Sequence, residues 1–91
     1  MLFEYDIRKS IGNEEKHGIN FKEAQVLWDD EWRMEVALHY KGERRNALIA
    51  SYGGVYWFAV FTTRRNVVRI ISVRRATAKE VSLYERKKSE R

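Results

Sequence analysis

The sequence predicts an α+β fold in which helices cover an antiparallel β-sheet within one small domain. Three observations predict it. Helix-capping patterns open segments near both ends of the chain, whereas apolar and polar residues alternate with the period of two of β-strands from residue 34 onward. Short turn signals separate those strands, so consecutive strands can pair antiparallel. The chain has 91 residues, 44% of them hydrophobic, which suits one domain over residues 1–91 with a modest core.

The first third of the chain predicts a strand and two helices. Residues 2–5 form the strand, and Asp6 can cap a helix that runs to about His17 and ends at the glycine that follows. Residues 20–23 (Asn-Phe-Lys-Glu) have the form of a capping box, which predicts the second helix. The acidic residues 29–31 would end it as a solvated turn. Its buried face would carry Phe21, Ala24, Leu27 and Trp28.

Four strands and a final helix follow. The strands are predicted over residues 34–40, 44–52, 55–62 and 67–74, with turn signals at 41–42, 53–54 and 64–66. The third strand is apolar on both faces, so it should be the central one. A second capping box at residues 77–80 opens a helix that ends near residue 88, and we expect the charged tail, about residues 86–91, to fray. The predicted order is β-α-α-β-β-β-β-α.

The charges of the chain are unevenly distributed. Residues 1–45 hold eight basic and ten acidic side chains, for a net charge of −2, whereas residues 46–91 hold ten and three, for +7. A stretch of eight basic residues without any Asp or Glu spans most of the second half. These are Arg44, Arg45, Arg64, Arg65, Arg69, Arg74, Arg75 and Lys79. Such a surface favours a polyanion such as RNA or DNA as the ligand, although a solvated basic face without a ligand is the alternative.

The residue inventory excludes several kinds of catalytic site. The chain has no cysteine, and its two histidines, His17 and His39, have no spacing typical of a metal site or a catalytic triad. No glycine-rich phosphate-binding motif is present. Because the basic stretch has no carboxylate, a metal-dependent nuclease is disfavoured, and we expect neither a metal nor a cofactor. Without a long apolar run or a signal peptide, we expect a cytoplasmic protein that does not contact a membrane.

Arginines could support cleavage of RNA, in which the 2′-hydroxyl attacks its own phosphate and guanidinium groups stabilise the charge that develops. Arg69 is the leading candidate because it interrupts an apolar strand. A period of two places Arg69 and Arg75 on one face and Arg74 on the other. Arg69 would either bind phosphate or form an ion pair with Glu43 or Glu80. The proton acceptor stays open among His17, Glu80, Glu43 and a lysine of lowered pKa.

Other side chains of the basic stretch are candidates for binding RNA rather than for cleaving it. Arg64 and Arg65 lie at a predicted turn, where contact with a partner and simple solvation are both open. Tyr52 and Tyr56 flank a hairpin and could stack on bases. Core packing is the favoured reading of Trp57, Phe58 and Phe61. The RNA-binding candidates are Arg44, Arg65, Arg75, Lys79, Tyr52 and Tyr56.

Two motifs together resemble the BrnT family of toxins from type II toxin–antitoxin systems. One is Lys16-His17-Gly18 after the strand-like segment 3–6 (FEYD), and the other is the segment 69–77 (RIISVRRAT). The resemblance covers roughly residues 2–85. It implies a RelE-like fold and a metal-independent endoribonuclease that inhibits translation. It also implies neutralisation by a BrnA-type antitoxin, with operator DNA bound only by the toxin–antitoxin complex.

The resemblance also implies site residues. The family's basic strand pattern falls on Arg45, Arg69 and Arg74, with Arg64 at the preceding turn, and His17 and Glu80 match patterned positions. One departure is the absence of an Ile-Gly pair around residues 49–50. Two other functions stay open on sequence alone. One is a non-catalytic nucleic-acid-binding module, and the other is an interaction protein whose basic face binds an acidic partner chain.

Overall fold

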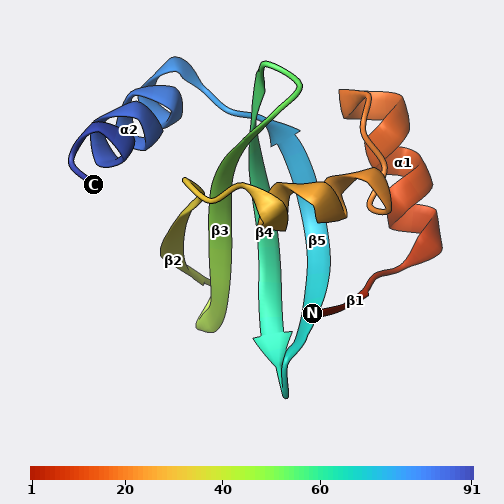
Figure 1. Ribbon diagram of the computed structural model, residues 1–91. Helices are drawn as coiled ribbons and strands as arrows, with labels where there is room; N and C mark the ends of the chain where they lie inside the picture. Colours follow the sequence, from red (N-terminus) through yellow and green to blue (C-terminus); the bar gives the residue numbers. More distant parts are fainter.

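A computed structural model describes all 91 residues and contains one five-stranded sheet, in the order β1-β5-β4-β3-β2 (Figure 1). The strands are β1 (Leu2–Glu4), β2 (Met34–Tyr40), β3 (Glu43–Tyr52), β4 (Val55–Arg64) and β5 (Val67–Arg75). Strands β2 to β5 form the predicted antiparallel meander, with β4 at the centre. The expectation of a purely antiparallel sheet is wrong, because β1 pairs parallel with β5. The fold is therefore α+β with a mixed sheet.

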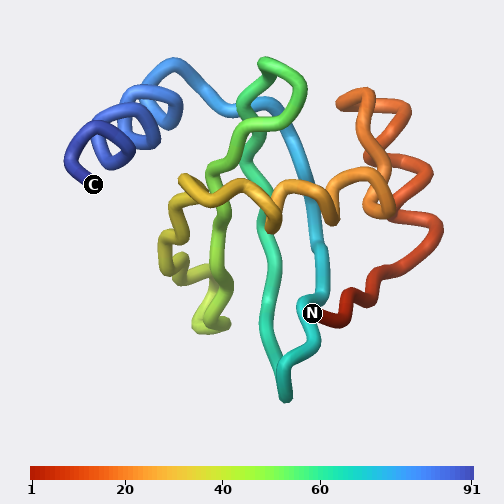
Figure 2. The backbone as a smooth tube through the Cα atoms, in the orientation of Figure 1, coloured from red at the N-terminus to blue at the C-terminus, as the bar shows by residue number.

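The helices occur in the predicted order: α1 (Ile7–His17), η1 (Glu23–Asp29) and α2 (Ala78–Ser89). The second differs from expectation because it is a 3₁₀-helix. A helix with three residues per turn aligns Ala24 and Leu27 on one edge, and both are fully buried, as is Phe21 just before η1. Figure 2 shows this segment crossing the sheet, with α1 beside β5 and α2 at the β3 side. None of the helices is long and apolar enough to cross a bilayer.

The predicted caps form. The Asp6 side chain accepts a hydrogen bond from the Arg8 N–H at 2.8 Å, and Gly18 ends α1 with a φ of 77°. Asn20 and Glu23 bond reciprocally at 3.1 and 2.8 Å, and Thr77 and Glu80 do the same at the start of α2. Local sequence therefore determines where each helix begins.

Three two-residue turns join the strands of the meander. Both residues of each turn have a positive φ, from 49° to 79°, which is the type I′ geometry that matches the twist of a hairpin. The last of these turns is Arg65-Asn66 rather than residues 64–66, so Arg64 ends β4.

The main core lies on one face of the sheet, which we call the helical face. Trp57, Ala59 and Phe61 of β4 point to this face and pack against η1. Trp28 of η1 stands edge-on to Phe61 and to Phe3 of β1, with both ring pairs at 5.2 Å. Trp57 and Phe61 are thus core residues, as the sequence favoured.

Helix α1 buries polar residues and exposes apolar ones. Ser10 and Asn13 are buried, whereas Ile7 and Ile11 are 63% and 54% exposed. The Asn13 side chain donates to the Val73 carbonyl at 2.8 Å and accepts from the Val73 N–H at 3.0 Å. It thus pairs with β5 as a strand would, beyond the point where β1 ends.

The opposite face of the sheet carries Phe58, Val60 and Thr62 of β4, and we call it the open face. Residues paired across an antiparallel ladder share a face. Thr62 pairs with Arg69, but Phe58 pairs with Arg74, because Ile71 is an extra residue between the pairs Phe61–Ile70 and Val60–Ser72. This β-bulge reverses the alternation.

The bulge corrects one expectation from the sequence. Arg69 and Arg74 share the open face, and Arg75, which pairs with Trp57, lies on the helical face. A strict period of two predicted the reverse grouping. The buried residues show the same reversal, because Val68 and Ile70 are buried before the bulge and Val73 after it.

Asp30 joins η1, β3 and α2. Its carboxylate accepts hydrogen bonds from the Trp32 N–H at 2.9 Å, the Ser51 N–H at 2.8 Å and the Tyr84 hydroxyl at 2.7 Å. Burial by itself raises the pKa of Asp30, but these three donors outweigh burial and hold the pKa below its ordinary value. The expectation of a merely solvated acidic turn is therefore wrong for this residue.

Candidate functional site

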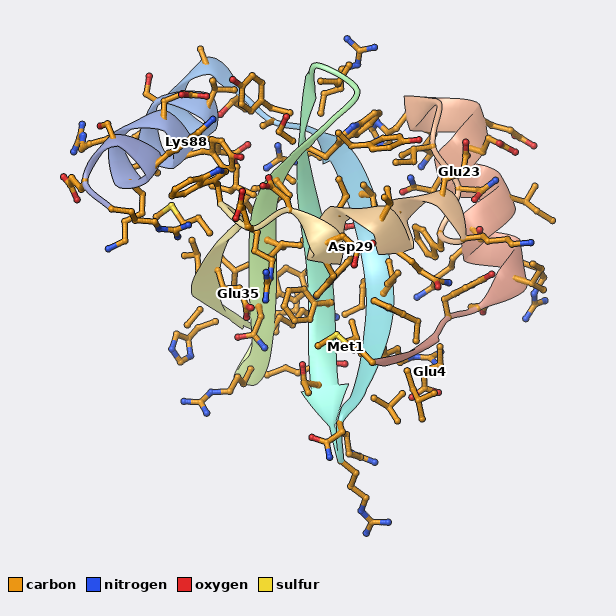
Figure 3. The ribbon with its side chains drawn as sticks, in the orientation of Figure 1. Met1, Glu4, Glu23, Asp29, Glu35 and Lys88 are labelled. Atoms are coloured by element: carbon orange, nitrogen blue, oxygen red, sulfur yellow. The ribbon has the colours of Figure 1, made fainter.

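The open face has a pocket of about 490 Å³ at the end of the sheet where β3 begins, β4 ends and β5 begins. We call it the open-face pocket. Eight of its nine lining residues are polar or charged. They are Glu4, Glu43, Arg44, Asn46, Thr62, Thr63, Arg64, Val67 and Arg69. Figure 3 shows Glu4 near this end of the sheet.

Arg69 occupies this pocket beside Glu4. The parallel register places Glu4 opposite Arg69, and a guanidinium nitrogen of Arg69 lies 3.4 Å from the Glu4 carboxylate. Both side chains are about half exposed, 49% and 53%. The sequence offered Glu43 or Glu80 as the ion-pair partner, and the structure identifies Glu4 instead. Such an exposed single contact holds the guanidinium only weakly.

Arg64 and Arg44 supply further positive charge to the pocket. Both line it, and neither forms an ion pair within 4.0 Å. Exposed guanidinium groups without a carboxylate partner can bind an anion without first breaking a contact. The open-face pocket therefore has capacity for a phosphate group.

Arg45 does not line the pocket and is more restrained than Arg44 and Arg64. It lies 3.3 Å from the Glu43 carboxylate, and its guanidinium packs over the Tyr40 ring at 4.8 Å. Its Nε atom is buried without a hydrogen-bond partner. Arg45 is consequently positioned by Tyr40, and it contacts Glu43, which lines the pocket.

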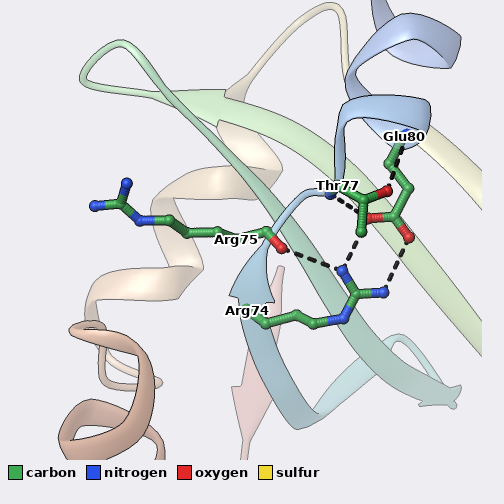
Figure 4. Close-up of polar contacts among 4 residues, drawn as sticks. All are labelled: Arg74, Arg75, Thr77 and Glu80. Atoms are coloured by element: carbon green, nitrogen blue, oxygen red, sulfur yellow. Dashed lines mark hydrogen bonds and ion pairs between the residues drawn. The ribbon is translucent and has the colours of Figure 1, made fainter.

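Arg74 lies on the same face but in a separate, occupied site (Figure 4). Its guanidinium donates to both Glu80 oxygens at 2.8 and 2.9 Å and to the Arg75 carbonyl at 3.1 Å. It also stacks over Phe58 at 4.1 Å. The hydrogen bonding between Arg74 and Glu80 raises the pKa of Arg74 and lowers the pKa of Glu80, and burial opposes both shifts.

The other expected site residues do not gather at the open-face pocket. Arg75 lies on the helical face, 5.8 Å from the Trp57 ring, and Arg65 is at the tip of a turn. Lys79 is exposed on α2, and His17 is exposed at the end of α1. None of these four lines the pocket.

The two tyrosines proposed for base contact also lie outside the pocket. Tyr52 is 52% exposed beside the Gly53-Gly54 turn. Tyr56 donates a hydrogen bond to Glu85, which raises the pKa of Tyr56, and its ring stands edge-on to Tyr84. Tyr56 therefore helps to dock α2.

Sequence reasoning missed Glu4, Asn46, Thr62 and Thr63 as pocket residues. Glu4 reaches Arg69 only because β1 pairs with β5, a contact across 65 residues that no local pattern encodes. Thr62 and Thr63 lie near the end of a strand that the sequence did show, directly before Arg64. Their position next to a candidate arginine was the available signal.

The geometry supports the binding of a phosphodiester and a proton transfer beside it. Three guanidinium groups, from Arg44, Arg64 and Arg69, approach one pocket together with two carboxylates, Glu4 and Glu43. Guanidinium groups recognise phosphate oxygens, and a carboxylate can accept a proton from a hydroxyl group.

Two comparisons with known proteins bear on this site. A family model described as "Ribonuclease toxin, BrnT, of type II toxin-antitoxin system" matches residues 5–80 of the 91-residue chain. The matched range includes η1, β2 to β5, and both members of the Arg74–Glu80 pair. No curated protein matches the sequence.

Proposed function

The chain belongs to the BrnT family of ribonuclease toxins of type II toxin–antitoxin systems, and from this premise we propose that it is a metal-independent endoribonuclease that inhibits translation. We further propose that its fold is RelE-like, that a BrnA-type antitoxin neutralises it in the cytoplasm, and that operator DNA is bound only by the complex. The observed order of strands and helices supports the fold assignment.

The observation that carries the proposal is the open-face pocket, which combines arginines and carboxylates at one end of the sheet. Both carboxylates contact arginines, Glu4 with Arg69 and Glu43 with Arg45. Each contact is single, and both carboxylates are more than half exposed, so either carboxylate can detach from its arginine and accept a proton. Arginines then supply the charge that a metal ion would otherwise supply.

In the proposed reaction, Arg64 and Arg69 bind the non-bridging oxygens of the scissile phosphate. Glu43 or Glu4 accepts the proton of the adjacent 2′-hydroxyl, whose oxygen attacks the phosphorus as the bond to the 5′-oxygen breaks. The 5′-oxygen takes up a proton from water, and the products are a 2′,3′-cyclic phosphate and a 5′-hydroxyl. Negative charge accumulates on the phosphate oxygens in the transition state, where the guanidinium groups stabilise it most.

Glu80 is unsuited to the role of base. Its pKa lies below the usual range because Arg74 donates to it, and its backbone contacts cap α2. We therefore propose that Glu80 and Arg74 hold α2 against the sheet. His17, at the end of α1, does not line the open-face pocket.

Cleavage of RNA by the purified protein in the presence of EDTA tests the proposal. We expect cleavage to persist in EDTA, and Arg64→Ala and Arg69→Ala each to lower the rate by about 100-fold with folding retained. Arg75→Ala is the matched variant on the same strand but the opposite face, and it should change the rate by less than about threefold. Full activity in the Arg64→Ala/Arg69→Ala double variant would show that the open-face pocket is not the active site.

A second experiment identifies the base. Glu4→Gln and Glu43→Gln are compared over pH 3–8 by their cleavage rates. The variant that lacks the base should lose the acidic limb of the pH–rate profile, whereas the other should keep that limb at a reduced rate. If RNA binds with normal affinity but no product forms from the wild-type protein at any pH, the chain is a non-catalytic RNA-binding module instead.

A further inference from the structure

Strand β2 leaves one side of its backbone unpaired. It is the outer strand of the sheet, and no backbone hydrogen bond joins residues 34–40 to anything but β3. Exposed edge strands usually carry Lys, Pro or a bulge that prevents pairing with another chain. The sequence of β2, MEVALHY, has none of these, and its register with β3 is unbroken. Figure 3 shows Glu35 on this strand.

The adjoining turn determines which residues of β2 direct their backbone groups outward. Lys41-Gly42 is a two-residue turn with φ values of 49° and 76°, and its flanking pair is Tyr40–Glu43. Residues that flank such a turn bond to each other, so Tyr40 directs its N–H and C=O toward β3. By alternation, Glu35, Ala37 and His39 direct theirs outward, and all three residues are exposed.

We propose that β2 pairs antiparallel with β2 of a second copy of this chain, about a two-fold axis that passes between the two Ala37 residues. In this register Ala37 faces Ala37, and Glu35 faces His39 of the other copy. In each of these pairs, the backbone N–H and C=O groups of both residues point toward the other strand. Each pair therefore exchanges two backbone hydrogen bonds, and no outward backbone group of Glu35, Ala37 or His39 stays unpaired. The pairing does not depend on the proposed ribonuclease activity.

The side chains suit this register. A small residue, alanine, occupies the axis, where the two copies come closest. Glu35 and His39 form an acid–imidazole pair on each side of it. On the open face, Val36 opposes Leu38 and Met34 opposes Tyr40, which extends the apolar strip of the sheet. Because the axis stands perpendicular to the sheet, both open faces would lie on the same side of a ten-stranded sheet.

The residues that flank the two ends of β2, Arg33 and Lys41, limit the proposed pairing to β2 itself. The Arg33 carbonyl already accepts a hydrogen bond from the Arg91 guanidinium at 3.2 Å. In the proposed register, Lys41 of the second copy faces Arg33, so like charges meet at both ends. These charges are exposed and are screened by salt, so we expect dimerisation to strengthen with ionic strength, in contrast to the binding of RNA.

Disulfide cross-linking tests the register, because the chain has no cysteine of its own. In Ala37→Cys, the two Cα atoms would be about 5.5 Å apart, within the range that a disulfide spans. In the matched control, Glu35→Cys, each new cysteine would face His39 of the other copy. The two cysteine Cα atoms would therefore be offset by four residues, about 13 Å along the strands. Under mild oxidation we expect Ala37→Cys to give mainly covalent dimer and Glu35→Cys mainly monomer. Equal cross-linking of both, or none in Ala37→Cys, would overturn the proposal.

Sedimentation over about 5–500 µM tests the non-covalent dimer, since a short edge contact is expected to be weak. Ala37→Pro removes an outward N–H without disturbing the β2–β3 ladder, so it should give a folded monomer, whereas Ala37→Ser should dimerise like the wild type. Lys41→Asp should tighten the dimer at least threefold, because the carboxylate would face Arg33. A wild-type protein that stays monomeric at every concentration would overturn the proposal. The same holds if the edge of β2 pairs only with an antitoxin and not with a second copy of this chain.

Discussion

Arg69 and Arg74 lie on the same face of the sheet, yet their partners give them different roles. Arg74 makes two hydrogen bonds to Glu80 at 2.8 and 2.9 Å and stacks on Phe58. Arg69 has a single contact of 3.4 Å with a half-exposed carboxylate. A guanidinium held by two bonds and a ring is costly to detach, whereas a weakly held one can transfer to a phosphate. Residue identity alone did not separate the two.

The Arg74–Glu80 pair should stabilise the fold in a pH-dependent way. Because the pKa of Glu80 is lowered in the folded protein, its contribution is present above the ordinary carboxyl pKa and is lost as the pH falls through the folded value. A double-mutant cycle with Arg74→Ala and Glu80→Ala, measured by urea unfolding, should give a coupling of about 1 kcal/mol at pH 7, allowing for solvent screening. The coupling should vanish near pH 2, and a constant coupling would contradict this account.

Asp30 should contribute more to stability than its neighbour. Asp30→Asn leaves one of three donors poorly satisfied and is expected to lower the free energy of unfolding by about 2 kcal/mol at pH 7. Asp29→Asn, at an exposed position, should change it by less than about 0.5 kcal/mol. Urea titrations compare the two. Since the pKa of Asp30 is lowered by folding, the difference between the variants should shrink as the pH falls below the ordinary carboxyl pKa of 3.8.

At the scale of elements, the sequence predicted what local interactions determine. Both capping boxes, the left-handed glycine after α1 and the type I′ turns involve residues close in the chain, and all of them form. Helix α1 shows the limit of such reasoning. Its burial of Ser10 and Asn13 depends on bonds to Phe21 and Val73, which lie outside the helix. No amphipathic pattern within the helix could have shown this.

The bulge at Ile71 is the element that sequence periodicity could not show, because apolar residues stand at both even and odd positions of β5. Its consequence for the arginines can be measured by NMR. We expect contacts between the Arg74 side chain and the Phe58 ring, with upfield-shifted Arg74 side-chain protons that return to ordinary values in Phe58→Leu. Contacts from Arg74 to Trp57, in place of Arg75, would show that the strand is regular and that our grouping is wrong.

At the scale of the whole molecule, folding brings carboxylates from elsewhere in the sequence next to the stretch that contains no Asp or Glu. Three glutamates that precede or follow the stretch in sequence form ion pairs with its arginines. Glu4 pairs with Arg69, Glu43 with Arg45, and Glu80 with Arg74. The remaining basic residues of the stretch form no ion pairs, and two of them, Arg44 and Arg64, line the open-face pocket. Charge counting therefore predicted the class of ligand, but only the folded chain distinguishes the arginines without an ion pair from the paired ones.

The affinity for single-stranded RNA should depend on salt in proportion to the number of arginines that line the open-face pocket. If Arg44, Arg64 and Arg69 each neutralise one phosphate, a plot of log K against log salt should have a slope of about −2. Removing Arg64 should make the slope shallower by about 0.7, whereas Arg74→Ala should leave it unchanged. Fluorescence anisotropy with a labelled RNA oligonucleotide measures both. A shallower slope in Arg74→Ala would show that Arg74 binds phosphate after all.

The parallel pairing of β1 with β5 has a consequence for synthesis of the chain. Glu4 emerges from the ribosome first, but its partner Arg69 lies in the last strand to be made. Contacts this distant in sequence form late in folding, because the intervening chain must first be ordered. The pocket is therefore incomplete on every nascent chain that has not yet extended through β5. A ribonuclease built in this way acquires its site only when its own message has been read almost to the end.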